Sequence, residues 1–264
     1  MRVDGKRIAK DIYARLPKKR AVLGIVVASH TPVIESFVRI KSRAAERIGV
    51  ELRRIDLLAR PATEDAVAAI EGLAPEVDGV IVQLPLPDPL DTERVLAAIP
   101  PYLDVDGINP TVSDEAKAVR SPVARALEEI LTECRVEVQG KRATVVGSGR
   151  LVGEPCAALL REMGALVTVL NRGDSLASLR DAQIVVLGAG EPGLVKPRML
   201  KEGVALIDAG ASESEGKVAG DADPACEAVS SVFTPVPGGV GPVAVAMIFK
   251  NLFDLMEQQN APAR

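Results

Sequence analysis

Short apolar runs alternate with longer amphipathic stretches along most of the chain. Most of the runs are rich in Val, Ile, Leu and Ala, the pattern of strands that are buried on both faces of a parallel sheet. The predicted strands are Ala21–Ala28, Val50–Leu57, Asp78–Gln83, Ala143–Val146, Leu166–Leu170, Ile184–Leu187, Ala205–Asp208 and Val232–Thr234. Because strands alternate with helices, the pattern predicts an α/β protein with mainly parallel sheets and right-handed connections.

The amphipathic stretches have recognisable helix ends. Asp4 is a candidate N-cap for the first helix, and Thr31-Pro32 places a capping hydroxyl and a proline at the start of the second, which should end at Gly49. The predicted helices are residues 4–16, 31–49, 63–73, 91–99, 122–134, 153–163 and 242–259. The polar segment Ser212–Val218 is predicted to be an exposed loop or hairpin.

The irregular segment Pro100–Ser121 interrupts this alternation, and long ordered loops are often functional. The chain of 264 residues is long enough for two domains. We place the boundary near residue 121. The last helix follows the second domain and is expected to return to the first.

Composition and charge narrow the function classes. The net charge is −4 and no basic block is present, which argues against nucleic acid as a partner. No secretory signal and no apolar run of about 20 residues is visible, so no membrane association is expected. Three separated cysteines, Cys134, Cys156 and Cys226, fit buried thiols in a reducing cytoplasm. The single histidine, His30, excludes mechanisms built on histidine pairs, and no spacing predicts a metal site.

The most informative stretch is Arg142–Arg172, which reads as strand, glycine turn, helix and strand. Gly147–Gly149 follows the first strand directly, and Gly153 falls in the first helical turn, where a missing side chain permits close packing. The free N–H groups and the positive dipole at such a helix start attract a pyrophosphate. The spacing therefore favours a dinucleotide site, although an ordinary strand–helix turn remains the alternative.

The end of the second strand bears on the choice of cofactor. In NAD sites an acidic residue at this position binds the ribose 2′-hydroxyl, whereas an arginine there suits the 2′-phosphate of NADP. Here the strand ends in Asn171-Arg172 and the first acid is Asp174. Ser148 could hydrogen-bond to the same phosphate and Arg150 could lie close to it in space, so the pattern favours NADP, and NAD remains the alternative.

Four further stretches could carry chemistry. Gln83 ends a predicted strand, where α/β proteins place ligands, and Lys41 lies one helical turn after Phe37. Asp104 and Asp106 offer two carboxylates on a loop, and TPVPGGVGP, residues 234–242, is rigid and lets a ligand approach the backbone. The first three also have a structural reading, as a strand-closing glutamine, an exposed lysine beside a core phenylalanine, and a simple turn. For residues 234–242 a flexible linker is less apt, because the prolines would stiffen it.

Together these stretches resemble one family, the bifunctional methylenetetrahydrofolate dehydrogenase/methenyltetrahydrofolate cyclohydrolases. The matching segments are SFVRIK, DGVIVQLPLP, DVDG, VVGSGRLVGEP, EPGLVK, GVALIDAG and FTPVPGGVGP, in family order over most of residues 24–250. QLPLP and PVPGGVGP are highly specific, whereas the glycine turn alone is not. The resemblance implies an N-terminal α/β catalytic domain, 1–120, completed by the C-terminal helix 242–264, and a Rossmann-type NADP-binding domain, 121–241.

The resemblance also implies a reaction and residue roles. 5,10-Methylenetetrahydrofolate would be oxidised with NADP to the methenyl form and then hydrolysed to 10-formyltetrahydrofolate. Lys41 would be the catalytic side chain of the hydrolysis with Gln83 as its polar partner, and Asp106 would hold the pterin. The implied folate-binding residues are Phe37, Leu84, Pro237 and Gly238. The implied cofactor-binding residues are Gly147, Ser148, Gly149, Arg150, Val152, Gly153, Arg172 and Ala211. A cytoplasmic homodimer serving one-carbon metabolism and purine biosynthesis is implied as well.

Departures from the family keep alternatives open. The family usually has Tyr at the position of Phe37 and Arg-Ser at Ser148-Gly149. The first departure motivates a dehydrogenase with little cyclohydrolase activity, and the second moves the 2′-phosphate contact to Arg172 or Arg150. A folate- or nucleotide-binding module without catalysis is a further alternative, as is a dehydrogenase for another small acid.

Overall fold

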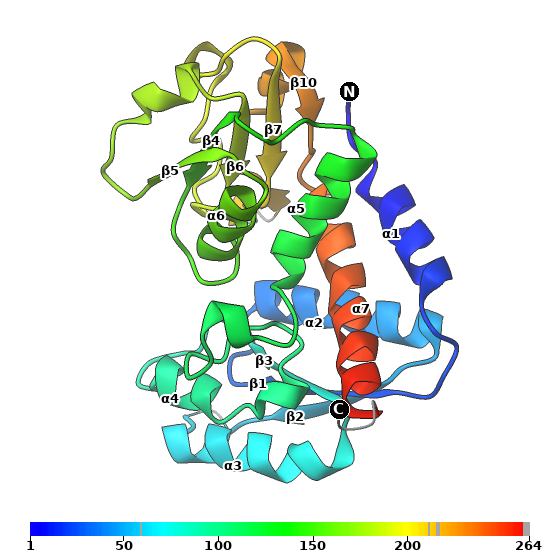
Figure 1. Ribbon diagram of the computed structural model, residues 1–264. Helices are drawn as coiled ribbons and strands as arrows, with labels where there is room; N and C mark the ends of the chain where they lie inside the picture. Colours follow the sequence, from blue (N-terminus) through cyan, green and yellow to red (C-terminus); the bar gives the residue numbers. More distant parts are fainter. Residues whose placement is uncertain (59, 211, 215–216, 261–264) are drawn as a thin grey trace. The chain divides into compact units, whose positions relative to one another are not determined.

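The computed structural model describes residues 1–58, 60–210, 212–214 and 217–260. The chain forms two compact units, which are coloured along the sequence in Figure 1. One unit contains Met1–Ile12 and Val123–Met247, and the other contains Tyr13–Pro122 and the chain from Ile248 onward. We call them the glycine-turn unit and the lysine unit, after the candidate residues that each contains.

The lysine unit is built on a three-stranded parallel sheet of order β2-β1-β3. The strands are β1 (Val22–Val27), β2 (Glu51–Asp56) and β3 (Gly79–Gln83). β1 is buried at every position because it is central, whereas β2 is an edge strand with exposed positions. In the register, Val27 pairs with both Asp56 and Gln83, so the three carboxyl ends lie at one edge of the sheet.

The helices of this unit lie where the sequence pattern predicts. They are α2 (Pro32–Ile48), α3 (Thr63–Leu73) and α4 (Thr92–Ala97), although α4 ends two residues before the predicted Ile99. The Thr31 hydroxyl accepts a hydrogen bond from the N–H of Ile34 (3.3 Å), and Gly49 takes a left-handed φ of 74°. The predicted irregular segment contains only the short 3₁₀ turns Pro101–Leu103 and Asp114–Ala116.

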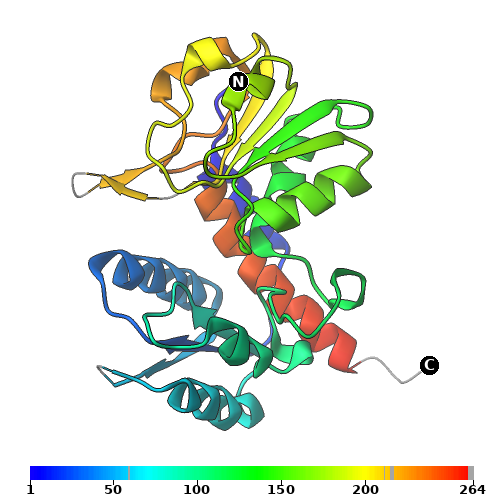
Figure 2. The same ribbon diagram turned by 90° about the vertical axis from the view of Figure 1, so that its left-hand side faces the viewer.

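The glycine-turn unit contains a five-stranded parallel sheet of order β10-β7-β6-β4-β5. Its strands are β4 (Arg142–Val146), β5 (Leu166–Leu170), β6 (Ile184–Leu187), β7 (Val204–Asp208) and β10 (Ser230–Phe233). Its helices α5 (Pro122–Glu133) and α6 (Gly153–Glu162) precede and follow β4 in the chain (Figure 2). β5 is an edge strand, so Leu166 is exposed although its apolar run suggested burial. Ser212–Ser214 (β8) and Lys217–Ala219 (β9) form the predicted hairpin.

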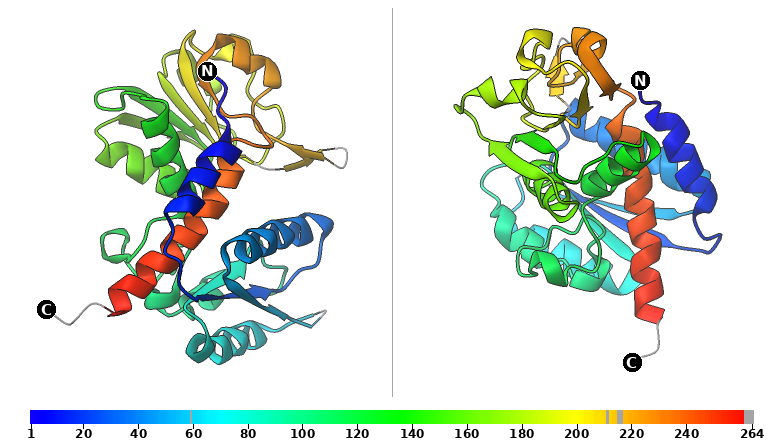
Figure 3. Two further views of the ribbon diagram at one scale, coloured as in Figure 1. Left: turned by 90° about the vertical axis from the view of Figure 1, so that its right-hand side faces the viewer. Right: turned by 45° about the horizontal axis from the view of Figure 1, so that its top comes forward.

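Helix α1 (Gly5–Arg15) begins after Asp4, whose carboxylate accepts a hydrogen bond from the N–H of Arg7 (3.0 Å). Helix α7 (Val240–Asn260) runs without interruption near the end of the chain (Figure 3) and starts two residues before the predicted Pro242. From Ile248 onward it belongs to the lysine unit, which confirms the predicted return of the C-terminal helix. Among the described residues, no helix has the length and apolarity that a membrane span requires.

The three cysteines are free thiols. Cys156 and Cys226 are buried as predicted, and burial raises the pKa of Cys156 to about 12. Cys134 is only partly buried.

Candidate active site

A lysine and a glutamine meet at the carboxyl edge of the three-stranded sheet. Lys41 lies on α2, and Gln83 is the last residue of β3 and only 7% exposed. The Lys41 ammonium donates a hydrogen bond of 2.8 Å to Gln83 Oε1, while Gln83 Nε2 donates one of 2.8 Å to the carbonyl of Leu84. Because the amide nitrogen is already engaged by backbone, the amide oxygen is turned toward the lysine.

Asp106 is the charged group that is coupled to this pair. Burial lowers the pKa of Lys41, and the negative charge of Asp106 opposes that shift. Burial in turn raises the pKa of Asp106 to about 7, although the positive charge of Lys41 works against the rise. The structure thus brings Lys41, Gln83 and Asp106 into one site, in which an amine and a carboxyl both titrate closer to neutrality than usual.

The loop that carries Asp106 is fixed by two side chains. Asp104 is buried, and its Oδ2 accepts a hydrogen bond of 2.7 Å from the N–H of Asn109. Its Oδ1 has no hydrogen-bond partner within the described part of the chain. From α7, the fully buried Asn251 donates hydrogen bonds to the carbonyls of Val105 (2.7 Å) and Arg120 (2.8 Å). These contacts hold the peptide immediately before Asp106.

Asn251 was not among the predicted site residues. Its signal in the sequence is a lone amide between Met247 and Leu255, at helical spacing on a buried stripe. A polar side chain on such a stripe requires partners inside the protein. The pattern identifies the residue as unusual, but only the fold shows that its partners are two carbonyls of the irregular segment.

The predicted folate-binding residues lie in both units. Phe37 lies one turn before Lys41 on α2 and is partly buried, and Leu84 packs against the core of the lysine unit. Pro237 and Gly238 lie in the glycine-turn unit just before α7. Pro237 is exposed, and Gly238 has a φ of 109° and accepts a hydrogen bond from the N–H of Gly5 (3.0 Å).

The glycine turn between β4 and α6 gives each glycine a different role. Gly147 has a φ of 97°, and a Cβ there would lie 2.5 Å from the carbonyl oxygen of Gly188. A Cβ on Gly153 would lie 2.0 Å from the carbonyl oxygen of Gly147, which confirms the predicted close packing of helix and strand. Gly149 has no atom within 4 Å of such a Cβ, so its missing side chain leaves open space.

The uncovered Gly149 adjoins the start of α6. Val152 directly precedes α6, and the carbonyl of Gly149 accepts hydrogen bonds from the N–H groups of Val152 (3.1 Å) and Glu154 (3.3 Å). Ser148 is exposed at the turn, and Arg150 follows it. A helix N-terminus beside an uncovered glycine offers N–H groups and a positive dipole to a phosphate.

Arg172 lies in a tight turn at the end of β5. The Asp174 carboxylate accepts a hydrogen bond of 2.7 Å from the N–H of Asn171, and the Asp174 N–H donates one of 3.0 Å to the Asn171 carbonyl. The first acid after the strand therefore closes the turn, while the Arg172 side chain is exposed. Ala211, the remaining predicted cofactor residue, lies outside the described residues.

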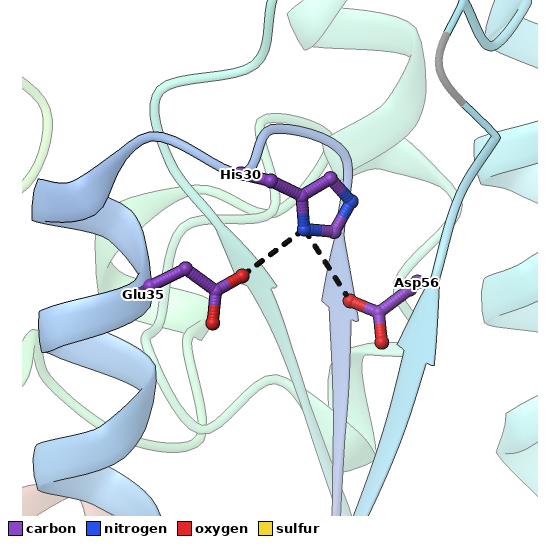
Figure 4. A group of neighbouring side chains, drawn as sticks. All are labelled: His30, Glu35 and Asp56. Atoms are coloured by element: carbon purple, nitrogen blue, oxygen red, sulfur yellow. Dashed lines mark hydrogen bonds and ion pairs between the residues drawn. The ribbon is translucent and has the colours of Figure 1, made fainter.

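A separate polar cluster lies at the ends of β1 and β2. His30 Nδ1 is 3.0 Å from Glu35 Oε1 and 3.7 Å from Asp56 Oδ1 (Figure 4). This trio has the spacing of metal ligands, a grouping that the sequence pattern did not predict. However, the Arg54 guanidinium donates to Glu35 (2.6 Å) and to Asp56 (2.7 Å). Hydrogen bonds from Arg54 and His30 lower the pKa of Glu35 to about 2. Because a guanidinium already bridges both carboxylates, we assign an ion-pair cluster.

Comparison with known proteins gives two matches that together cover most of the chain. Residues 3–106 match the model of the catalytic domain of tetrahydrofolate dehydrogenase/cyclohydrolase, and residues 121–260 match the NAD(P)-binding domain of the same enzymes. This chain belongs to the tetrahydrofolate dehydrogenase/cyclohydrolase family. Family membership confirms the predicted two-domain α/β fold and the predicted enzyme class, a dehydrogenase/cyclohydrolase of one-carbon metabolism. It argues against a non-catalytic binding module and against a dehydrogenase for another small acid.

Individual relatives agree with the family models over nearly the full length. The chain is 36% identical to a bifunctional protein FolD from Halothermothrix orenii, covering 94% of this chain and 95% of that protein. A FolD structure from Trypanosoma brucei with NADP and an inhibitor superimposes with a TM-score of 0.92 at 30% identity, covering 99% of both chains. A FolD structure from Campylobacter jejuni gives 0.91 at 28% identity, covering 98% of this chain and 99% of that one.

Proposed function

We propose that this enzyme oxidises 5,10-methylenetetrahydrofolate to the methenyl form with NADP and hydrolyses the methenyl form to 10-formyltetrahydrofolate. The observation that carries the proposal is the Lys41–Gln83 hydrogen bond of 2.8 Å beside the coupled carboxyl of Asp106, in a chain with both family domains. Residues 1–120 with the C-terminal helix would form the folate domain, and residues 121–241 the cofactor domain.

In the hydrolysis, we assign proton handling to Lys41. Water adds to the methenyl carbon and loses one proton, and the remaining hydroxyl proton passes to N5 as the C–N5 bond breaks and the formyl C=O forms. Burial lowers the pKa of Lys41, so the neutral amine that can take the first proton forms at lower pH than in an exposed lysine. Gln83 holds the amine in place through its oxygen, and Asp106 would accept hydrogen bonds from the pterin while its charge tunes the lysine.

In the oxidation, bound NADP supplies the hydride acceptor. The residues of this chain would bind and orient it. Gly147 and Gly153 permit close backbone packing of the turn, Gly149 leaves open space beside it, and the positive end of α6 would attract the pyrophosphate. Arg172, exposed at the end of β5, would contact the 2′-phosphate, with Ser148 and Arg150 as further contacts. NAD is the alternative cofactor.

One assay tests the proposal directly. Purified enzyme is given 5,10-methylenetetrahydrofolate with NADP or with NAD, and the reduced cofactor and the methenyl product are followed together. The proposal expects turnover with NADP and no build-up of methenyl product, and it expects Lys41→Met to leave the oxidation running while methenyl accumulates. Turnover with NAD alone would refute the role of Arg172, and no turnover with either cofactor would refute the function.

Phe37 favours a second candidate, a dehydrogenase with weak cyclohydrolase activity. The side chain lacks a hydroxyl one helical turn from Lys41, so the lysine has one fewer polar neighbour to orient it. Accumulation of methenyl by the wild type, reversed by Phe37→Tyr, would support this candidate. Accumulation that Phe37→Tyr leaves unchanged would contradict it.

We further propose a homodimer in the cytoplasm that supplies one-carbon units, including those for purine biosynthesis. These assignments follow from the family resemblance. Sedimentation of the purified enzyme at assay concentration would test the dimer, and a monomer would contradict it.

A further inference from the structure

Two buried carboxylates at the carboxyl edge of the five-stranded sheet have no role in the proposed chemistry. Asp208 ends β7 and is 2% exposed, and Asp221, in the loop after β9, is fully buried. Burial raises the pKa of both side chains, that of Asp208 to about 6. Buried charges are costly unless they are well hydrogen-bonded, so their partners indicate what they do.

Asp221 is surrounded by backbone N–H groups of a single loop. Its Oδ2 accepts hydrogen bonds from Ala189 (2.7 Å) and Gly190 (3.1 Å), and its Oδ1 accepts one from Glu191 (2.8 Å). These three consecutive residues form the exit from β6, and Gly190 has a φ of 70°. Successive N–H groups arranged in this way form a concave anion site, which the protein fills with its own carboxylate.

Asp208 holds the neighbouring loops in a similar way. Its two oxygens accept hydrogen bonds from the N–H groups of Gly210 (3.0 Å) and Ala222 (2.8 Å). The hydroxyl of the buried Thr234, at the start of the TPVPGGVGP segment, accepts a hydrogen bond of 2.7 Å from the Asp208 N–H. The exits from β6, β7 and β10 are therefore joined through two carboxylates and one hydroxyl.

The two carboxylates interlock with glycines. A Cβ on Gly210 would lie 2.3 Å from Asp221 Cγ, and a Cβ on Gly220 would lie 2.3 Å from Asp208 Oδ2. The Asp221 carboxylate therefore fills the space beside Gly210, two residues after Asp208. The Asp208 carboxylate fills the space beside Gly220, the residue before Asp221. This packing leaves the loops little freedom to shift.

The loop that Asp221 holds contacts the glycine turn itself. A Cβ on Gly147 would lie 2.5 Å from the carbonyl oxygen of Gly188, and one on Gly188 would lie 2.4 Å from Val152 Cγ1. Gly188 directly precedes the three residues whose N–H groups bind Asp221. A shift of this loop would consequently move the backbone on which the start of α6 rests.

We propose that Asp221, supported by Asp208, is a positioning residue for dinucleotide binding: it holds the exit loop of β6 against the glycine turn. Asp221 is not assigned a contact with the cofactor. The inference rests on the proposed use of the glycine turn by NADP.

The test is Asp221→Asn, which keeps the shape of the side chain. One of the two accepting oxygens becomes an NH2 group, which would face backbone N–H donors. We expect KM for NADP and the Kd of NADPH to rise by roughly 10- to 100-fold, the effect of losing one charged hydrogen bond. The KM for methenyltetrahydrofolate, measured without cofactor, should change much less. Leu179→Ala is the matched control, because it removes a buried core side chain of the same unit and none of these hydrogen bonds.

The outcomes separate this inference from the proposed function. If the wild type does not bind NADPH, the proposed function fails and the inference falls with it. The second outcome is that the wild type binds NADPH and the two variants lose a similar amount of thermal stability. If Asp221→Asn then has the same KM for NADP as Leu179→Ala, only the inference is overturned. A parallel loss of oxidation and hydrolysis in Asp221→Asn would also overturn it, because the residue would then act on the whole fold.

Discussion

Replacing Gln83 tests the proposed site through the residue that holds the lysine. Gln83→Met keeps the length of the side chain but removes the oxygen that lies 2.8 Å from Lys41 Nζ. A hydrogen bond that involves a charged group contributes about 1.5–3 kcal/mol, and about 1.4 kcal/mol corresponds to a tenfold change in rate. If the bond orients Lys41 for proton transfer, the cyclohydrolase kcat/KM should fall by roughly 10- to 100-fold. The oxidation requires no proton transfer by Lys41 and should lose much less.

The assay follows the loss of methenyl absorbance for hydrolysis and the gain of reduced cofactor for oxidation. Ser42→Ala is the matched control, since Ser42 is the next residue on α2 and its hydroxyl donates a hydrogen bond to the carbonyl of Val38 (3.0 Å). The control should leave both activities unchanged. An unchanged hydrolysis rate in Gln83→Met, or an equal fall of both activities, would refute the reasoning.

Gln83→Glu extends the test to pH. Burial lowers the pKa of Lys41, so the neutral amine forms, and hydrolysis rises, at lower pH than for an exposed lysine. A carboxylate in place of the amide stabilises the ammonium and raises the pKa of Lys41. The rising limb of the pH profile should therefore move to higher pH. A limb that stays in place or moves to lower pH would exclude Lys41 as the titrating base.

Three further predictions address the remaining parts of the site. Arg172→Ser should raise KM for NADP by roughly 10- to 100-fold, the effect of losing a charged contact, and leave KM for NAD unchanged; an equal rise for both cofactors would contradict a 2′-phosphate contact. Asn251→Leu leaves two buried carbonyls without their hydrogen bonds, at a cost of about 1–3 kcal/mol each, and should lower the thermal midpoint. It should also raise KM for folate in both activities and leave KM for NADP unchanged. Gly153→Ala places a Cβ 2.0 Å from the Gly147 carbonyl oxygen and should weaken NADPH binding, measured by fluorescence, by tenfold or more. Gly149→Ala places its Cβ in open space, so the protein without cofactor should accommodate the added methyl group.

The parts of the fold that local patterns determine were predictable from the sequence. Thr31-Pro32 and Gly49 delimit α2 because a capping hydroxyl and a left-handed glycine act on their own neighbours. Gly153 was predicted to permit close packing because its position in the motif requires it. The exposure of Leu166 was not predictable, since an apolar run indicates a strand but not whether the strand lies at the edge of its sheet.

The side chains that surround the candidate sites were missed for a related reason. Asn251 binds the carbonyl of Val105 across 146 positions of sequence, and Asp221 binds three N–H groups about 30 positions away. Such side chains have backbone partners, and a backbone N–H or carbonyl has no identity that a sequence pattern can show. Lys41 and Gln83 could be proposed from the sequence because the chemistry proposed for them belongs to their own side chains. The residues that fix loops around a site are therefore recognised from a structure by their buried hydrogen bonds, and in the sequence they appear only as isolated polar residues.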